Sequence, residues 1–194
     1  MHAILTVPGI GNSEPEHWQS IWEHRYPGVT RVMQRDWDQP VCSEWAAAVE
    51  EAVATSAQPL VIVAHSLGCL AVAHWAFSSA REVAGLVLVA VPDPEGANFP
   101  AAAQGFGPVP PDIRGRPALI VSSGDDHYGN AHWSRQLARA YGAQLIELIN
   151  AGHINVASGF GEWQDGWNRV SAFAEHQKIM RESKSQMTRP VSVA

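Results

Sequence analysis

The sequence predicts an α/β fold, a doubly wound and mostly parallel sheet of six strands with helices on both faces. Short apolar segments rich in β-branched residues alternate along the chain with longer segments of helical periodicity. Two of the apolar segments, 60–64 and 85–90, contain no charged or strongly polar residue, which is typical of strands buried on both faces. A chain of 194 residues is long enough to bury a full core in one domain.

The expected strands follow one another at the spacing of a repeated strand and helix unit. They cover residues 3–6, 29–34, 60–64, 85–90, 118–122 and 144–149. Between them, apolar residues recur every three or four positions, as in amphipathic helices. The first helix is expected to begin at a capping Ser13 and to run to Arg25, and the second to run from a capping Ser43 to about residue 55. Further helices are expected directly after residue 68, over 131–141, and from about 167 to 175.

Two segments do not fit this alternation. Residues 92–117 contain seven prolines and four glycines, so they are expected to form an irregular cover with at most one helical turn, near 101–103. Residues 178–194 are polar and without apolar periodicity, and we expect a disordered tail there. The domain is therefore predicted to span residues 1–177.

Composition excludes several classes of protein. The formal net charge of −6 is opposite to the basic surface that nucleic acid binding requires. No run of eighteen apolar residues is present, so neither a transmembrane helix nor a membrane partner is expected. The amino terminus has no basic leader before its first strand, which argues against a signal peptide. Two cysteines, Cys42 and Cys69, are expected to be reduced, and a cytoplasmic location is expected.

The most informative segment is 60–77, where an apolar strand runs into a helix through a sharp polar corner. Ala64, Ser66 and Gly68 form the pattern small-x-Ser-x-Gly, in which the small residues allow strand and helix to pack closely around the serine. Such a turn exposes the serine hydroxyl at the carboxyl end of the strand. It also directs the backbone N–H of Leu67, at the start of the helix, toward an oxyanion formed there.

The glycine-rich loop after the first strand allows two interpretations. Gly9 and Gly11 match the first two glycines of a dinucleotide-binding loop, but the third position is Glu14, whose charge would oppose a pyrophosphate. We therefore expect no nucleotide and no other cofactor. The better interpretation is a bend whose N–H groups face Ser66, with Ile10 as the second oxyanion donor and Gly11 as the next choice.

Acidic and basic candidates follow the later strands. Asp125 and Asp126 follow the strand at 118–122, and His153 follows the last strand. Because ligands collect beyond the carboxyl ends of parallel strands, these loops and the Ser66 turn are expected to meet. The order serine, aspartate, histidine is that of a hydrolase in which His153 activates Ser66 and an aspartate orients His153. Asp125 and Asp93 remain alternatives to Asp126 as the acid.

Five short motifs occur together in this chain. They are Val7-Pro8-Gly9-Ile10-Gly11 with His17-Trp18, Asp38-Gln39-Pro40 with Trp45, His65-Ser66-Leu67-Gly68, Ser123-Gly124-Asp125-Asp126, and Gly152-His153-Ile154-Asn155 followed by Ser158-Gly159-Phe160-Gly161-Glu162-Trp163. With them the chain resembles a small α/β-hydrolase of the retinoblastoma-binding protein 9 and YdeN family of serine hydrolases, over about residues 3 to 177. The resemblance implies Asp126 as the acid and a fold without a large lid. The chain differs in having His127 where the family often has proline.

The leading hypothesis is a serine hydrolase acting on small carboxylic esters or amides through an acyl-enzyme on Ser66. The alternative is a non-catalytic protein-interaction module that keeps the fold and uses a tryptophan-rich surface; its partner would be unknown. Among the eight tryptophans, three follow loops that face the site and are expected to form pocket walls: Trp18, Trp133 and Trp163. His65 is expected to be a wall or supporting residue of the site.

A metal site is the remaining alternative. His127 and His132 lie close in sequence to Asp125 and Asp126. They lack both the i, i+4 pair of histidines on a helix and the cysteines that strong metal motifs carry. We therefore expect no metal.

Overall fold

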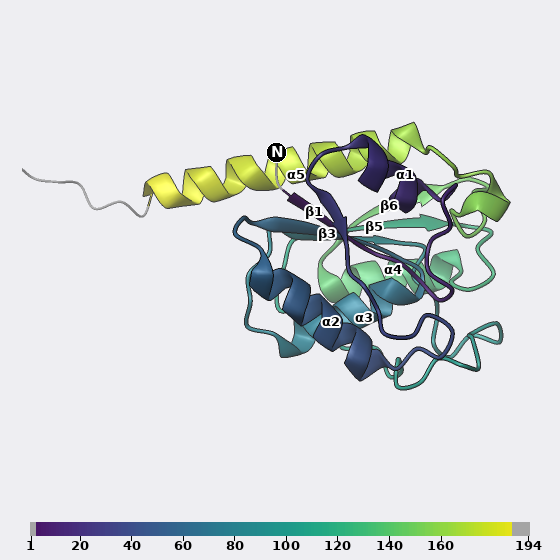
Figure 1. Cartoon of the computed structure of the whole chain (residues 1–194). Coiled ribbons are helices and arrows are strands. Elements are labelled where there is room, and N and C mark those ends of the chain that lie inside the picture. Colours follow the sequence, from purple (N-terminus) through teal and green to yellow (C-terminus); the bar gives the residue numbers. More distant parts are fainter. Residues whose placement is uncertain (1–2, 188–194) are drawn as a thin grey trace, which may run out of the picture.

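The computed structural model describes residues 3–187. Its centre is a six-stranded sheet of order β2-β1-β3-β4-β5-β6, and every neighbouring pair of strands is parallel (Figure 1). The strands are β1 (Ala3–Val7), β2 (Val29–Arg31), β3 (Leu60–His65), β4 (Gly85–Val89), β5 (Ala118–Ser123) and β6 (Gln144–Leu148). The order reverses direction at β1 and β3, so the sheet is doubly wound, as the sequence predicts.

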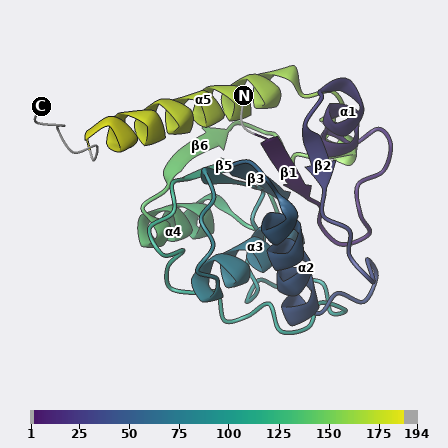
Figure 2. The same ribbon diagram turned by 60° about the vertical axis from the view of Figure 1, so that its left-hand side comes forward.

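Helices cover both faces of this sheet. They are α1 (Trp18–Arg25), α2 (Cys42–Thr55), α3 (Leu67–Ser78), α4 (Ala131–Tyr141) and α5 (Gln164–Met187), with a short 3₁₀ helix, η1, at Val156–Ser158. In both ribbon views α1 and α5 lie on one face and α2, α3 and α4 on the other (Figure 2). The described helices include none that is long and apolar enough to cross a bilayer.

The central strand β3 shows why the sheet has two cores. Ile62 and Ala64 belong to the apolar cluster under α2 and α3, whereas Val61 and Val63 belong to the cluster under α1 and α5. Successive side chains of a strand point to opposite faces, so an uninterrupted apolar strand must be covered on both sides. This burial fixes the carboxyl end of β3, where Ser66 follows.

Two helix starts differ from the sequence prediction. The capping residue of α1 is His17, whose Nδ1 accepts the N–H of Gln19 at 3.2 Å, rather than Ser13. Ser13 instead donates its hydroxyl to Oε1 of Gln19, so it braces the same turn from outside the helix. Helix α2 begins at Cys42, one residue before the expected Ser43 cap, and the N–H of Cys42 donates to the carbonyl oxygen of Gln104.

The prediction of a disordered tail from residue 178 is wrong as far as Met187, because α5 continues to that residue. Gln177 is buried, and Arg181 donates to the carbonyl oxygen of Val83, so the helix stays attached to the body of the protein beyond residue 177. Glutamate, lysine, glutamine and arginine are good helix formers, and a solvated helix needs no apolar stripe. Residues 188–194 of the predicted tail lie outside the described residues.

The proline-rich segment 92–117 has the expected irregular course. A turn closes between Pro100 and Ala103, and Gln104 forms an isolated bridge with Val41. Phe106 and Ile113 are buried against the core under α2 and α3. The segment therefore packs as a fixed cover beside the site.

Candidate active site

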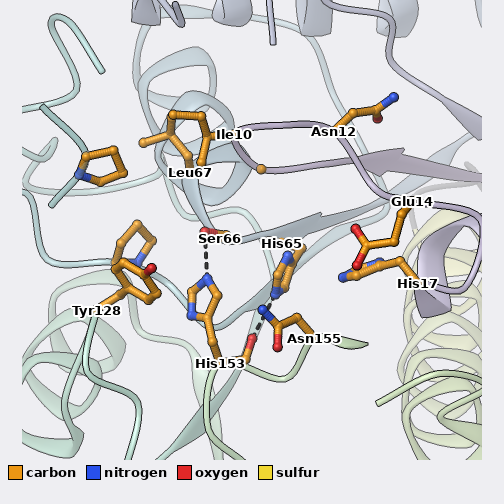
Figure 3. Close-up of a pocket in the computed structure, with 13 residues that line it drawn as sticks. Ile10, Asn12, Glu14, His17, His65, Ser66, Leu67, Tyr128, His153 and Asn155 are labelled. Carbon is orange, nitrogen blue, oxygen red and sulfur yellow. Dashed lines mark hydrogen bonds between the residues drawn. The ribbon is translucent and has the colours of Figure 1, made fainter. Parts of the chain in front are cut away.

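A cavity of about 230 Å³ lies beyond the carboxyl ends of the central strands, where the sequence places the site (Figure 3). Its lining comes from the loops after β1, β3, β4, β5 and β6. The residues that line it include Ile10, Glu14, His17, His65, Ser66, Leu67, Tyr128, His153 and Asn155. Loops far apart in sequence thus converge on Ser66.

Ser66 occupies the tight turn between β3 and α3. Its backbone has φ 53° and ψ −128°, a strained conformation for a residue with a side chain. The close packing around it leaves no room for larger neighbours: a Cβ on Gly68 would lie 2.4 Å from the carbonyl oxygen of Pro8, and one on Gly9 would lie 2.8 Å from Cβ of Ser66. Gly68 is therefore required by the close approach of backbone, as the small-x-Ser-x-Gly pattern predicts, and Gly9 by the close approach of Ser66.

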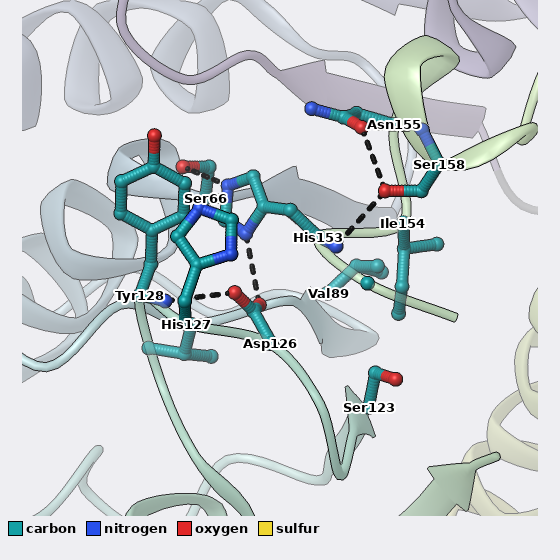
Figure 4. A network of polar contacts seen from close by, with 12 residues as sticks. Ser66, Val89, Ser123, Asp126, His127, Tyr128, His153, Ile154, Asn155 and Ser158 are labelled. Atoms are coloured by element: carbon teal, nitrogen blue, oxygen red, sulfur yellow. Dashed lines mark hydrogen bonds and ion pairs between the residues drawn. The ribbon is translucent and has the colours of Figure 1, made fainter. Parts of the chain in front are cut away.

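Ser66, His153 and Asp126 form one hydrogen-bonded chain (Figure 4). Nε2 of His153 lies 2.8 Å from Oγ of Ser66, and its Nδ1 lies 2.8 Å from Oδ2 of Asp126. The other oxygen of Asp126 accepts the N–H of Tyr128 at 2.9 Å. Asp126 is 2% exposed and His153 is 8% exposed, so water has little access to the bond between them.

The competing acids are engaged elsewhere. Asp125 is exposed and accepts hydrogen bonds from the Ser123 hydroxyl and from the N–H of Gly152. Asp93 accepts the N–H of Glu95 at 3.0 Å, within its own turn. Of the three candidates, Asp126 is the one hydrogen-bonded to the His153 ring. Asp125 instead holds the backbone of the loop that carries His153.

That loop is held by polar side chains. The N–H of His153 donates to Oγ of Ser158 at 3.1 Å, and Ser158 in turn donates to Asn155. The N–H of Ala151 donates to Oγ of Ser123, at the end of β5. These bonds join the loop after β6 to the loop that carries Asp126.

The first loop is positioned to supply a hydrogen-bond donor. Ile10 and Leu67 both line the cavity beside Ser66. Leu67 is the first residue of α3, so its N–H has no acceptor within the helix. The N–H of Gly11 donates to the carbonyl oxygen of Trp37 at 2.9 Å, so it is already bonded. Ile10 is therefore the better candidate for the second oxyanion donor.

Two further histidines lie next to His153. Nε2 of His65 donates to the carbonyl oxygen of His153 at 2.9 Å, and His17 packs against His65 with ring centroids 4.9 Å apart. Burial lowers the pKa of His65 well below 6.5; burial, with Arg31 and His153 nearby, lowers the pKa of His17 to about 4. Both rings are therefore neutral near pH 7, and neither places a second positive charge beside an imidazolium at His153.

The prediction of tryptophan pocket walls is wrong, because none of the three lines the cavity. Trp18 is fully buried and donates its indole N–H to the carbonyl oxygen of Ile154. Trp163 packs against Trp18 with ring centroids 5.2 Å apart, and Trp133 donates its indole N–H to the carbonyl oxygen of Val91. These indoles hold the surrounding loops in place.

The aromatic wall is Tyr128 instead, with its ring centroid 4.6 Å from that of His153. Its position two residues after Asp126, beyond the end of β5, is a signal that could have identified it from the sequence. The described residues also bear on the expected metal and disulfide chemistry. No group of histidine, cysteine or acidic side chains within residues 3–187 could hold a metal ion. The two cysteines are free and buried.

Comparison with known proteins shows the family of the chain. The serine hydrolase family matches residues 4–172, most of the chain. The chain belongs to this family. It is 32% identical to a protein described as a YdeN-like hydrolase from Pectobacterium atrosepticum, covering 90% of this chain and 91% of that one with a TM-score of 0.78. The chain is therefore a small YdeN-like serine hydrolase.

Two more distant structures share the fold. The ydeN gene product of Bacillus subtilis is 20% identical, covers 89% of this chain and 98% of its own, and has a TM-score of 0.76. A hydrolase of the α/β superfamily from Xanthomonas campestris is 19% identical, with 92% and 99% covered and a TM-score of 0.58. No curated protein matches the chain.

Proposed function

We propose that this serine hydrolase cleaves small carboxylic esters or amides through an acyl-enzyme on Ser66. The observation that carries the proposal is the continuous chain of hydrogen bonds from Asp126 through His153 to the Ser66 hydroxyl. A serine hydroxyl is a weak nucleophile unless a neighbouring base takes its proton. His153 is within hydrogen-bonding distance to do so as Ser66 attacks a carbonyl carbon.

The developing charges have partners in the site. Asp126 holds the Nδ1–H tautomer of His153 and stabilises the imidazolium that forms. The negative oxygen of the tetrahedral intermediate would accept hydrogen bonds from the backbone N–H groups of Ile10 and Leu67. A donor of this kind contributes about 3 to 4 kcal/mol of transition-state stabilisation.

The same groups complete the reaction. His153 returns its proton to the leaving alcohol or amine, and the acyl group stays on Ser66. Water, deprotonated by His153, then attacks the acyl carbonyl; the bond from the acyl carbon to Oγ of Ser66 breaks, and His153 returns the proton to Oγ as the acid leaves. A cavity of about 230 Å³ supports a small substrate group beside Ser66.

The test uses a fluorophosphonate probe and a panel of short chromogenic acyl esters and small amides. Wild type is expected to be labelled and to turn over at least one substrate of the panel. Ser66→Ala is expected to lose labelling and at least about 10⁴-fold in kcat. Asp126→Asn is expected to lose about 10⁴-fold in kcat because asparagine favours the wrong histidine tautomer.

Asp93→Asn is the matched control, because within residues 3–187 the hydrogen bond of that carboxylate is to the N–H of Glu95 in its own turn. It is expected to leave kcat unchanged. Equal labelling of wild type and Ser66→Ala, with both proteins folded by circular dichroism, would contradict the proposal.

A further inference from the structure

The cavity beside Ser66 has two chemically different ends. At one end lie Tyr128 and the apolar side chains of Ile10 and Leu67. At the other, next to α1, lie Glu14 and His17, and Figure 3 shows these two side chains together. The proposed chemistry uses Ser66, His153 and the neighbouring N–H groups, and it assigns nothing to Glu14 or His17.

The tautomer of His17 follows from its role as a helix cap. Its Nδ1 accepts the backbone N–H of Gln19 at 3.2 Å, and a backbone N–H can only donate. A neutral imidazole with an accepting Nδ1 carries its proton on Nε2. The lowered pKa of His17, about 4, keeps the ring neutral in the physiological range.

This Nε2–H has no acceptor among the described residues, although His17 is only 2% exposed. A buried donor without a partner is unfavourable, and such groups in native proteins point to a missing partner. His17 lines the cavity, so a molecule bound there can supply the missing acceptor.

The neighbouring carboxylate restricts what that acceptor can be. A substrate carboxylate would accept from His17 but would be repelled by Glu14. A substrate ammonium group would be attracted by Glu14 but offers no lone pair to the Nε2–H. A hydroxyl satisfies both, because its oxygen accepts from His17 and its hydrogen is donated to Glu14.

We propose that Glu14 and His17 form a subsite that binds a hydroxyl group of the substrate. The subsite rests on the proposed function, because the molecule that carries the hydroxyl is the ester or amide attacked by Ser66. His17 and Glu14 are specificity residues that contact the substrate away from the reacting carbonyl.

The experiment uses two pairs of esters in which a methyl group is exchanged for a hydroxyl. On the acyl side, ethyl 3-methylbutanoate is compared with ethyl 3-hydroxybutanoate; on the alcohol side, propyl acetate is compared with 2-hydroxyethyl acetate. Acid release gives kcat/KM for each. Wild type is expected to favour the hydroxyl member of one pair by about 10-fold, the effect of roughly one well-placed hydrogen bond.

His17→Asn is the decisive variant, because asparagine is a good helix cap but has no Nε2–H. It is expected to lower that ratio from about 10-fold to about 1, through KM. Glu14→Gln is expected to lower it in part, since an amide still offers an oxygen acceptor. His24→Asn, at an exposed histidine of the same helix outside the cavity, is expected to keep the 10-fold ratio.

The subsite would be overturned by a wild-type ratio near 1 in both pairs. It would also be overturned if His17→Asn left the ratio unchanged, and the Nε2–H of His17 would then be assigned to a bound water. Equilibrium binding of the same esters to Ser66→Ala separates this proposal from the proposed function. If wild type hydrolyses no ester while Ser66→Ala still binds the hydroxyl member about 10-fold more tightly, the reaction is wrong and the subsite stands. If wild type hydrolyses the esters without any hydroxyl preference, the proposed reaction stands and the subsite is wrong.

Discussion

The turn that carries Ser66 and the loop that carries His153 are held in place by different interactions. The turn is fixed by backbone packing: β3 and α3 are buried, and Gly68 lies directly against the backbone of the first loop. The His153 loop is fixed by the side chains of Ser123, Asp125 and Ser158, which accept hydrogen bonds from its backbone N–H groups. Packing of this closeness leaves no room for adjustment, whereas a set of hydrogen bonds can be weakened one at a time.

The largest effect is expected for Gly68→Ala, at the packed turn. Its Cβ would lie 2.4 and 2.5 Å from the carbonyl oxygens of Pro8 and Val7, so strand and helix must separate. We expect a loss of about 3 kcal/mol in the free energy of unfolding, measured by urea denaturation, together with loss of fluorophosphonate labelling.

Gly124→Ala is the matched control for this prediction. No atom outside its neighbours lies within 4 Å of the added Cβ, so its stability is expected to stay within about 0.5 kcal/mol of wild type. Equal stability of the two variants would mean that the Ser66 turn can rearrange to fit the added Cβ. The turn would then be no more rigid than the His153 loop, contrary to the comparison made above.

An intermediate effect is expected for Ser158→Ala, in the His153 loop. The change removes the acceptor of the His153 N–H and leaves the ring contacts with Asp126 and Ser66 in place. We expect the protein to lose about 1 kcal/mol of stability and about 10-fold in kcat/KM while remaining folded.

Ser171→Ala serves as the control, because the Ser171 hydroxyl has no partner among the described residues. That variant is expected to match wild type in both measurements. Complete loss of activity in a folded Ser158→Ala protein would show that the His153 loop tolerates the loss of a single contact no better than the Ser66 turn does.

The smallest effect is expected for Asp125→Asn, and it depends on pH. Hydrogen bonds from the Ser123 hydroxyl and the N–H of Gly152 lower the pKa of Asp125 below its ordinary value of 3.8. The stabilisation by its carboxylate is therefore fully present above pH 3.8 and is lost as pH falls through the lower folded pKa.

Urea midpoints of wild type and Asp125→Asn are expected to differ at pH 6 and to converge as the pH falls below 3.8. The difference at pH 6 should be smaller than that of Ser158→Ala, because Asp125 is exposed to solvent. A difference that stays constant from pH 6 to pH 2 would exclude a contribution from the charge.

The same contrast explains what could be predicted from the sequence. Backbone packing restricts residue type at fixed spacing, so Ala64, Ser66 and Gly68 identify the turn directly. Strand order then places the loops with Asp126 and His153 at the same sheet edge. Residue type alone does not separate Asp125 from Asp126, because adjacent aspartates in a loop differ only in the direction in which their side chains point.

Other features depend on distant contacts that no local pattern encodes. Ser13 has the residue type of a helix cap, yet His17 caps α1. Trp18 and Trp163 have the expected positions after loops, but they contact each other instead of the cavity. Helix α5 continues through a polar segment and is attached to the body of the protein where Arg181 donates to the carbonyl oxygen of Val83, 98 residues away.

The positive φ of Ser66 is a conformation that the residue would leave if its surroundings allowed it. The packing of β3 and α3 on either side of the turn therefore keeps the Ser66 hydroxyl directed into the cavity before any ligand binds. We expect this conformation to relax at the first loosening of β3 against α3, while most of the helix content is still present. Loss of activity is therefore expected at a lower urea concentration than loss of the helical circular dichroism signal.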